Sequence, residues 1–315
     1  MIITLTSTTS SKVAARLVRL REEGGAVALG RVLTLIISAP PEHVERAVDA
    51  ANDASREHPC RVLVVSPQAA TEGDADLADG LDAEIRVGGD AGASEVIVLR
   101  PRGGAATELD SLVMPLLLPD APIVTWWPAT PPDSPSADPL GAMAQRRITD
   151  ALECSAPIER LLRLAEDHAP GDTDLAWARA TLWRGLIAAA LDEPPFTPVL
   201  SITIRGNTAH PSLVLLGAWL RQTLDVPVTL EEVADAPALT GVVLHRENGD
   251  VVMERPVDST ILKISEPSGV SHRVSLPLRT LSDSLIEDLR RLDPDDVYGE
   301  VLTTALPALV GESAG

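Results

Sequence analysis

Residues 31–66 read RVLTLIISAPPEHVERAVDAANDASREHPCRVLVVS, and they decide the fold class of the first half of the chain. The two ends of this stretch, residues 31–38 and 60–66, are apolar runs of strand length, which is typical of strands buried on both faces of a sheet. Between them, Pro41 suits the first turn of a helix, and apolar side chains recur on one stripe over residues 44–54. A strand, a helix and a strand in this order predict a parallel pair with a right-handed crossover.

Further elements of the same kind lie on both sides of this unit. Helically spaced apolar residues predict a helix that begins after Thr8 or Ser10 and ends before Gly24-Gly25. Strands are expected at residues 85–88, 95–100 and 123–127. Residues 138–152, which include Met143, Arg146 and Arg147, are expected to form a helix. These elements predict a layered α/β domain with a largely parallel sheet.

The pattern changes at residues 168–174, HAPGDTD, where Pro170-Gly171 interrupts regular structure before a new helix cap. We therefore place an N-terminal α/β domain at residues 1–168 and a C-terminal α+β domain at residues 169–315. The expected elements of the second domain are a long helix at 174–191, a strand before Asn207, a helix at 211–224, hairpins at Asn248-Gly249 and Pro267–Gly269, and a helical region from Ser282 broken at RRLDPDDVY. Its sheet should be mostly antiparallel.

Charge and composition exclude several classes of partner. The formal net charge is −20, and no basic block or basic amphipathic stretch compensates for it locally, so nucleic acid and anionic membrane surfaces are poor partners. The longest apolar stretch, residues 112–127, is interrupted by prolines and cannot span a membrane. No export signal is visible at the start of the sequence, and Cys60 and Cys154 lie far apart. A reduced, cytoplasmic setting is expected.

Motifs for catalysis, metals and cofactors are missing from the sequence. The glycine-rich loop at residues 88–92 carries Asp90 at its centre and leads into a strand, whereas a phosphate cradle leads into a helix. The six histidines lack metal-binding spacing, and no GxSxG elbow occurs. Cys60 opens a buried strand and is expected to be a core residue. We expect no enzyme activity, no cofactor and no metal site.

Tryptophans and arginines supply the candidate residues for binding a partner. In the helix at 174–191, Trp183 falls on the apolar arc and is expected in the core, whereas Trp177 falls outside it, beside Arg184. Tryptophan with arginine is a pairing enriched in interface hot spots, and local packing under a loop is the alternative. Trp126-Trp127 end a strand, so one should be buried and the other can face outward.

The adjacent residues Arg146 and Arg147 complete this set. Two neighbouring guanidinium groups could bind a carboxylate or a phosphate between them. The alternative for this pair is a solvated face with one structural salt bridge. The partner-binding candidates are Trp126, Trp127, Arg146, Arg147, Trp177 and Arg184.

Five ordered blocks of sequence also resemble a known family. They are REEGGAVALGRVLTLII (21–37), ANDASREHPCRVLVV (51–65), RVGGDAGASEVIVLR (86–100), APIVTWWP (121–128) and QRRITDA (145–151). They are similar to the OpcA family, the glucose-6-phosphate dehydrogenase assembly proteins of actinobacteria. The similarity runs from about residue 8 to residue 155. It continues more loosely through residues 175–196 and 289–306.

This resemblance implies a non-catalytic assembly factor or allosteric activator that binds glucose-6-phosphate dehydrogenase, the entry enzyme of the oxidative pentose phosphate pathway. An effector of this kind needs a surface that distinguishes two states of its target, and no active site. One alternative is a sugar-phosphate-binding enzyme that uses Arg146 or Arg147. Another is a module that bridges pathway enzymes. For the first function, we expect binding through an apolar, arginine-bearing patch, because the net charge disfavours steering between acidic proteins.

Overall fold

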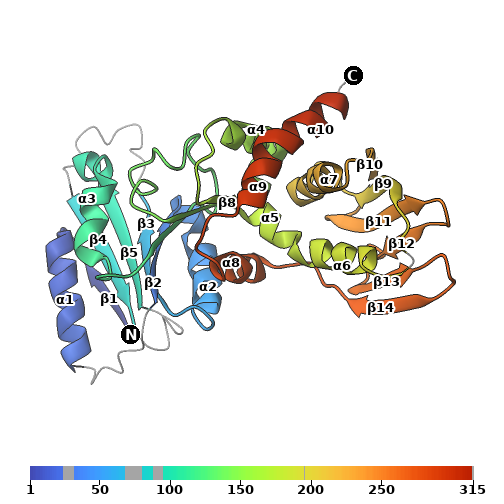
Figure 1. The fold of residues 1–315 in the computed structure, drawn as a ribbon. Coiled ribbons are helices and arrows are strands. Elements are labelled where there is room, and N and C mark those ends of the chain that lie inside the picture. The colour runs from blue at the N-terminus through green and yellow to red at the C-terminus, as the bar shows by residue number, and fades with distance from the viewer. Residues whose placement is uncertain (24–31, 68–79, 88–94, 195, 314–315) are drawn as a thin grey trace. The chain divides into compact units, whose positions relative to one another are not determined.

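The structure is a computed structural model that describes residues 1–23, 32–67, 80–87, 95–194 and 196–313 (Figure 1). The chain forms two compact units, and neither of them is one continuous segment. Unit 1 comprises Met1–Asp150, Gly171–Thr173 and Leu281–Pro294, and unit 2 comprises Ala151–Pro170, Asp174–Thr280 and Asp295–Gly315. The single boundary at 168/169 remains a prediction, and it did not anticipate that residues 281–294 return to unit 1.

Unit 1 is built on an eight-stranded sheet with the strand order β1-β4-β5-β3-β2-β6-β7-β8. The strands are β1 (Ile2–Leu5), β2 (Leu33–Ser38), β3 (Cys60–Val65), β4 (Gly80–Arg86), β5 (Glu95–Arg102), β6 (Ile123–Trp126), β7 (Arg146–Thr149) and β8 (Asp172–Asp174). The pairings from β5 through β3, β2 and β6 to β7 are parallel, and β1 and β4 add antiparallel pairings at one edge. The largely parallel sheet is thus confirmed.

The predicted strand–helix–strand unit is present as β2, α2 (Val44–Ala54) and β3. The two strands pair in parallel, from Leu33 opposite Cys60 to Ser38 opposite Val65. Every residue of β3 is buried, as a strand covered on both faces requires. The short 3₁₀ turn η1 (Pro41–His43) begins at the expected proline and leads directly into α2.

Helices cover both faces of this sheet (Figure 1). On one face lie α1 (Ser10–Glu23) and α3 (Leu109–Val113), and on the other lie α2 and α8 (Leu281–Leu289). Helix α1 places Val13, Leu17 and Leu20 in the core at the predicted spacing. Helix α8 packs against α2, where the Ser282 hydroxyl donates to Asp53 Oδ2 at 3.0 Å.

Residues 138–152 do not form the helix that we expected. After a single turn, in which the N–H of Ala142 donates to the carbonyl of Asp138 at 2.8 Å, the chain enters β7. A Cβ atom at Gly141 would collide with the carbonyl oxygen of Pro135, so the chain is tightly folded at this turn. All four residues of β7 are buried beside β6. Burial in a sheet therefore outweighs the helical spacing of this segment.

Unit 2 is built on a six-stranded sheet with the order β10-β9-β11-β12-β13-β14. The strands are β9 (Val199–Gly206), β10 (Val228–Glu232), β11 (Leu239–Arg246), β12 (Val251–Glu254), β13 (Ile261–Ser265) and β14 (Ser271–Ser275). Only β10 pairs in parallel, so the mostly antiparallel sheet is confirmed. Both predicted hairpins are present, and their turns place Gly249 at φ 112° and Gly269 at φ 86°.

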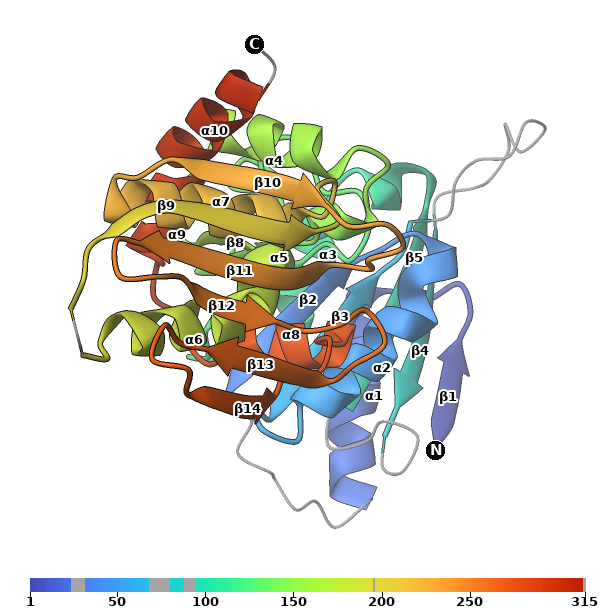
Figure 2. The same ribbon diagram turned by 90° about the vertical axis from the view of Figure 1, so that its right-hand side faces the viewer.

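The helices of unit 2 include α7, which matches the predicted helix at 211–224. They are α4 (Pro157–Glu166), α5 (Leu175–Arg179), α6 (Thr181–Leu191), α7 (Pro211–Leu224), α9 (Asp296–Glu300) and α10 (Leu306–Ser313). The single helix expected at 174–191 is interrupted at Ala180, which separates α5 from α6. Figure 2 shows the strands in front of α5 and α7, so these helices pack on one face of the sheet.

The described residues also form four short helical turns, which are η3 (Gly103–Ala106), η4 (Met114–Leu116), η5 (Ala151–Glu153) and the π-helical η6 (Val301–Ala305). Of the helices in the described ranges, none is long and apolar enough to cross a membrane.

Candidate functional site

Trp126 and Trp127 are both buried, with exposed fractions of 0% and 3%. The N–H of Trp127 donates to the carbonyl of Ile148 at 2.9 Å, and a Cβ atom at Gly141 would lie 3.0 Å from the Trp127 ring. The turn around Gly141 thus packs against this ring. Our prediction that one of the two tryptophans can face outward is wrong, because the segment after β6 folds back over the end of the strand.

Arg146 and Arg147 point to opposite faces of β7, and each is buried in an ion pair. Arg146 Nε donates to Asp288 Oδ1 on α8 at 2.9 Å. Arg147 Nε bonds Asp172 Oδ1 on β8, and its Nη1 donates to the carbonyl of Ala144 at 2.9 Å. The pair is neither an open clamp nor a solvated face, so both interpretations of it are corrected.

Trp177 is buried inside unit 2, although it lies outside the apolar arc of the helix. Its Nε1 donates to Asp295 Oδ2 at 2.8 Å, and its ring centroid lies 5.8 Å from that of Tyr298. The Arg184 guanidinium lies 3.5 Å from the Trp177 ring centroid, so the expected contact between these two residues is present. The structure favours the packing alternative, since only Arg184 among the six candidates keeps a partly exposed side chain.

Two predictions about core residues are confirmed. Trp183 is 3% exposed, and Cys60 is fully buried with its Sγ 2.9 Å from Ser55 Oγ. Neither Cys60 nor Cys154 forms a disulfide. The glycine-rich loop at 88–92 lies outside the described residues. Within the described part of the chain, no three His, Cys, Asp or Glu side chains form a group that could hold a metal ion.

One face of the unit 2 sheet is not covered by any described element of unit 2; we call it the open face, and the sequence did not lead us to predict it. In Figure 2 this face is turned toward the viewer, and no described element of unit 2 lies in front of it. In each strand, every second side chain points to the open face. The side chains between them, such as Ile204, Leu244 and Leu262, point to the core on the other side of the sheet. Polar residues at every second position of β13 and β14, such as Lys263 and Arg273, were the available signal.

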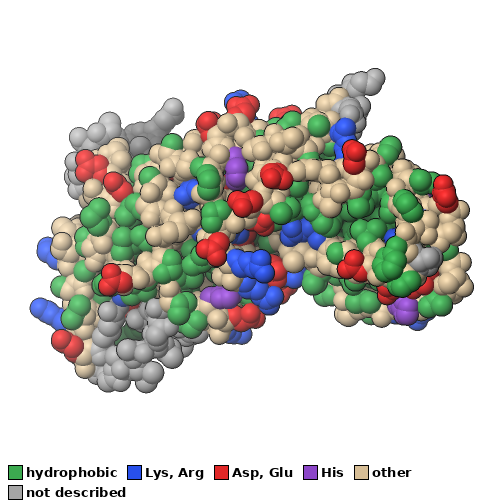
Figure 3. Space-filling view, in the orientation of Figure 1, with side chains coloured by type: hydrophobic (Ala, Val, Ile, Leu, Met, Phe, Trp, Pro, Cys, Tyr) green, Lys and Arg blue, Asp and Glu red, His purple; other side chains and the backbone are tan. Residues whose placement is uncertain are grey.

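One row of residues crosses all six strands of the open face. Strand registers place the row in the order Glu231, Arg205, Gly241, Glu254, Lys263, Arg273. Arg205 Nε lies 2.8 Å from Glu231 Oε2, and Lys263 is one of only two lysines in the chain. Basic residues outnumber acidic ones in this row, although the chain as a whole carries a net charge of −20. In the view of Figure 3, acidic side chains are scattered over the surface.

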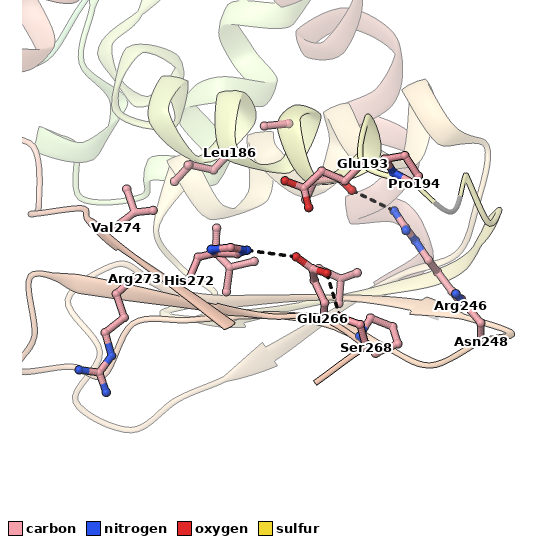
Figure 4. A pocket seen from close by; sticks show the side chains of 15 residues that line it. Leu186, Glu193, Pro194, Arg246, Asn248, Glu266, Ser268, His272, Arg273 and Val274 are labelled. Carbon is pink, nitrogen blue, oxygen red and sulfur yellow. Dashed lines mark hydrogen bonds and ion pairs between the residues drawn. The ribbon is translucent and has the colours of Figure 1, made fainter. Parts of the chain in front are cut away.

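A cavity of about 670 Å³ lies between α6 and the two hairpins of unit 2. Figure 4 shows His272 and Glu266 facing one another inside it, with Nε2 and Oε1 3.3 Å apart, while Arg273 points away. Ser268 Oγ donates to Glu266 Oε2 at 3.1 Å, and Arg246 Nη2 donates to the carbonyl of Ala190 at 3.4 Å. Apolar side chains of α6, β11–β12 and β13–β14 complete the lining.

The bonding in this cavity does not match nucleophilic catalysis. A serine nucleophile needs its hydroxyl bonded to a base, and the base in turn oriented by a third group. Here the hydroxyl of Ser268 and the ring of His272 both bond the same carboxylate, that of Glu266. The arrangement stabilises the tip of the β13–β14 hairpin.

Comparisons with known proteins match both halves of the chain. Residues 51–166 match the family model for the N-terminal domain of a glucose-6-phosphate dehydrogenase subunit, and residues 170–302 match the family model for its C-terminal domain. The two matches follow one another in the order of the α/β and α+β units, so the class is a two-domain family whose two models carry the same description. The chain belongs to the OpcA family.

Curated relatives carry the same family name. The chain is 30% identical over 150 residues to the putative OxPP cycle protein OpcA of Synechococcus elongatus, a match that covers 45% of this chain and 33% of the relative. It is 31% identical over 103 residues to the protein of that name from Synechocystis, covering 32% and 22%. The matched region therefore spans a third or less of the length of these relatives.

The solved structures that align with this chain include oxidoreductases, and their sequences have low identity to it. Biliverdin reductase from Synechocystis aligns with a TM-score of 0.44 at 8% identity, covering 89% of this chain and 98% of the reductase. The myo-inositol dehydrogenase of Lactobacillus casei aligns with a TM-score of 0.43 at 10% identity, covering 90% and 95%. Likeness at this level carries no functional argument.

Proposed function

We propose that this chain is a non-catalytic assembly factor or allosteric activator that binds glucose-6-phosphate dehydrogenase in the oxidative pentose phosphate pathway. The observation that carries the proposal is the pair of consecutive family matches over residues 51–166 and 170–302. The site of action would be the cytoplasm, as the composition suggests.

The rival function, a sugar-phosphate-binding enzyme that uses Arg146 or Arg147, loses its proposed ligands. Both guanidinium groups are buried in ion pairs with aspartates of the same unit. To bind a phosphate, either arginine would have to leave its carboxylate buried and uncompensated, which is strongly unfavourable. The other alternative, a module that bridges pathway enzymes, would also bind the dehydrogenase. It would differ from an assembly factor or activator because it would leave the kinetics and the oligomeric state of the dehydrogenase unchanged.

The open face is our proposed contact surface for the dehydrogenase. The six partner-binding candidates of the sequence analysis are mostly buried, whereas Glu254, Lys263 and Arg273 are exposed on this face. Ile261 is also 42% exposed there and supplies an apolar contact. A row of mixed charge lets an acidic protein approach a partner without the repulsion that its net charge of −20 would cause elsewhere.

Charge reversal on the open face tests this proposal. Lys263→Glu and Arg273→Glu should each weaken binding to the dehydrogenase, because the added negative charge at the contact increases the repulsion that the net charge of −20 already causes. The matched control is Lys12→Glu, which reverses the other lysine on an exposed position of α1. Affinity would be measured by light-scattering titration and by the change in dehydrogenase velocity.

The expected result is weaker binding for both open-face variants and wild-type binding for Lys12→Glu. If all three variants bind like the wild type, another surface makes the contact. If the wild-type chain neither binds the dehydrogenase nor changes its kinetics, the proposed function is wrong.

A further inference from the structure

A second cavity in unit 2 has three arginines among its lining residues. Its volume is about 200 Å³, and it lies between α5–α6, the first turn of α7 and residues 276–279. Its charged side chains are those of Arg179, Arg255 and Arg279, and within the described ranges no Asp or Glu lines it. Leu278 at the lining is 48% exposed, so the cavity reaches the surface. We call it the arginine pocket.

Arg255 is the deepest cation of the arginine pocket, at 4% exposure. Its Nη1 donates to the carbonyl of Leu276 at 2.9 Å, and its Nη2 donates to the carbonyl of Leu239 at 2.5 Å. Its guanidinium also lies 5.7 Å from the Trp183 ring centroid. These partners are neutral, so they satisfy hydrogen bonds without cancelling the charge, and burial lowers the pKa of Arg255. An anion in the pocket would supply the missing countercharge.

Ser212 offers the pocket an unused polar group. It is fully buried in the first turn of α7, and its hydroxyl has no hydrogen-bond partner among the described residues. Buried hydroxyl groups are nearly always bonded, so this hydroxyl is available to hydrogen-bond a ligand that enters the cavity. The N-terminus of a helix of this length also attracts negative charge.

The ring of His210, at the N-terminus of α7, is affected by the positive charge of Arg179 in the same pocket. Burial and the charge of Arg179 lower the pKa of His210 to about 4, so its ring is neutral at neutral pH. Its Nδ1 accepts the N–H of Ser212 at 3.2 Å, which leaves the ring hydrogen on Nε2. A neighbouring anion would favour the protonated ring and raise this pKa.

We propose that the arginine pocket binds the phosphate group of a small phosphorylated metabolite. The arginine side chains, the Ser212 hydroxyl and the N-terminus of α7 place several hydrogen-bond donors around one cavity, which match the several acceptor oxygens of a phosphate better than the two of a carboxylate. The cavity is smaller than the roughly 300–1,000 Å³ typical of drug-sized ligands, which limits the ligand to a few carbon atoms beside the phosphate. Trp183 and Leu276 provide an apolar wall for that part.

The test uses inorganic phosphate as the probe and the full chain as the protein. Phosphate, acetate and chloride would be titrated at equal ionic strength, and His210 would be followed by NMR together with the melting temperature. We expect phosphate alone to saturate, raise the melting temperature and move the pKa of His210 upward from about 4. Arg179→Gln and Ser212→Ala should weaken phosphate binding by about tenfold or more.

Arg163→Gln is the control, because it removes an exposed arginine of α4 that does not line the pocket. Arg179→Gln is preferred to a change at buried Arg255, whose loss can prevent folding. Equal responses of the wild type and both pocket variants would overturn the proposal, as would no saturable effect of phosphate. Acetate acting as strongly as phosphate would overturn the assignment to phosphate. None of these outcomes depends on the dehydrogenase.

Discussion

At the scale of single residues, burial decides what the charged and aromatic side chains of this chain do. Arg146 looks from sequence like a free cation, but its position on β7 places it against Asp288, which also accepts a hydrogen bond from Thr173 Oγ1 at 3.0 Å. The sequence identifies the residue type but not this partner, which lies 142 positions away. Contacts between distant residues follow from the tertiary fold, and local periodicity carries no information about them.

The first residue-scale prediction concerns this ion pair. Arg146→Met should lower the free energy of unfolding by about 3–5 kcal/mol, because it leaves the Asp288 carboxylate buried without a countercharge. Arg290→Ala is the control, since its side chain is 59% exposed beside Glu287, and it should cost less than about 1 kcal/mol. Urea unfolding measures both values. A loss for Arg146→Met as small as that of the control would contradict the structural role.

The second residue-scale prediction is a pH dependence of stability that arises from His210. The pKa of His210 is lowered in the fold from 6.5 to about 4, so the unfolded chain binds a proton in this window and the folded chain does not. Stability should therefore be highest above about pH 6.5 and fall by up to about 3 kcal/mol toward about pH 4.

His210→Asn keeps a cap for α7 without a titrating ring, so its stability should fall less steeply over the same range. Urea unfolding of both proteins in phosphate-free buffers provides the comparison. Parallel pH profiles for the two proteins would show that His210 makes no such contribution.

At the scale of elements, local signals predicted those parts of the fold that local chemistry determines. The helix at 211–224, the turns at Gly249 and Gly269, and the β2-α2-β3 unit all follow from caps, turn residues and hydrophobic period. The prediction at 138–152 failed because neighbouring β6 selects a strand there. The break at Ala180 left no local signal, since the helical spacing continues through it.

Glycine substitutions give an element-scale prediction. Gly249→Ala should destabilise the β11–β12 hairpin by about 1–2 kcal/mol, because φ there is 112° and the added Cβ would lie 3.0 Å from Pro267. Gly185→Ala, in the middle of α6 with open space around it, should instead stabilise by about 0.5–1 kcal/mol. Thermal unfolding measures the change in stability for both variants. A change of the same sign for both would contradict the assigned backbone conformations.

At the scale of the whole molecule, the chain passes between its two units several times. Residues 281–294 belong to unit 1, and residues 295–315 belong to unit 2. The pattern of predicted elements changes near residue 170, and this change located one boundary between the units. The packing of α8 against α2 depends instead on contacts between distant residues, such as that of His58 Nε2 with the carbonyl of Ile286 at 3.2 Å. The open face was signalled only by the polar residues that alternate along β13 and β14, because a strand pattern does not say which side of the sheet the other elements leave uncovered.

Limited proteolysis should first cut the chain within residues 166–170. These residues are exposed or half-buried at and after the end of α4, whereas the proline-rich segment 128–139 is held by buried Pro128, Ala129, Pro131 and Pro135. A protease that cleaves after acidic residues can act at Glu166 or Asp167, and mass spectrometry of the first fragments identifies the site. First cuts within 33–65 or 242–278 would contradict the element assignments.

The central claim is that the chain binds glucose-6-phosphate dehydrogenase and changes its assembly or activity without catalysing a reaction itself. The most direct measurement titrates the dehydrogenase with the purified chain from low to moderate salt, while native mass and velocity are followed together. We expect a complex with altered kinetics whose affinity holds steady or improves with salt, because salt screens the repulsion due to the net charge of −20. Unchanged mass and velocity at every salt concentration, or turnover of substrate by the chain alone, would contradict the claim.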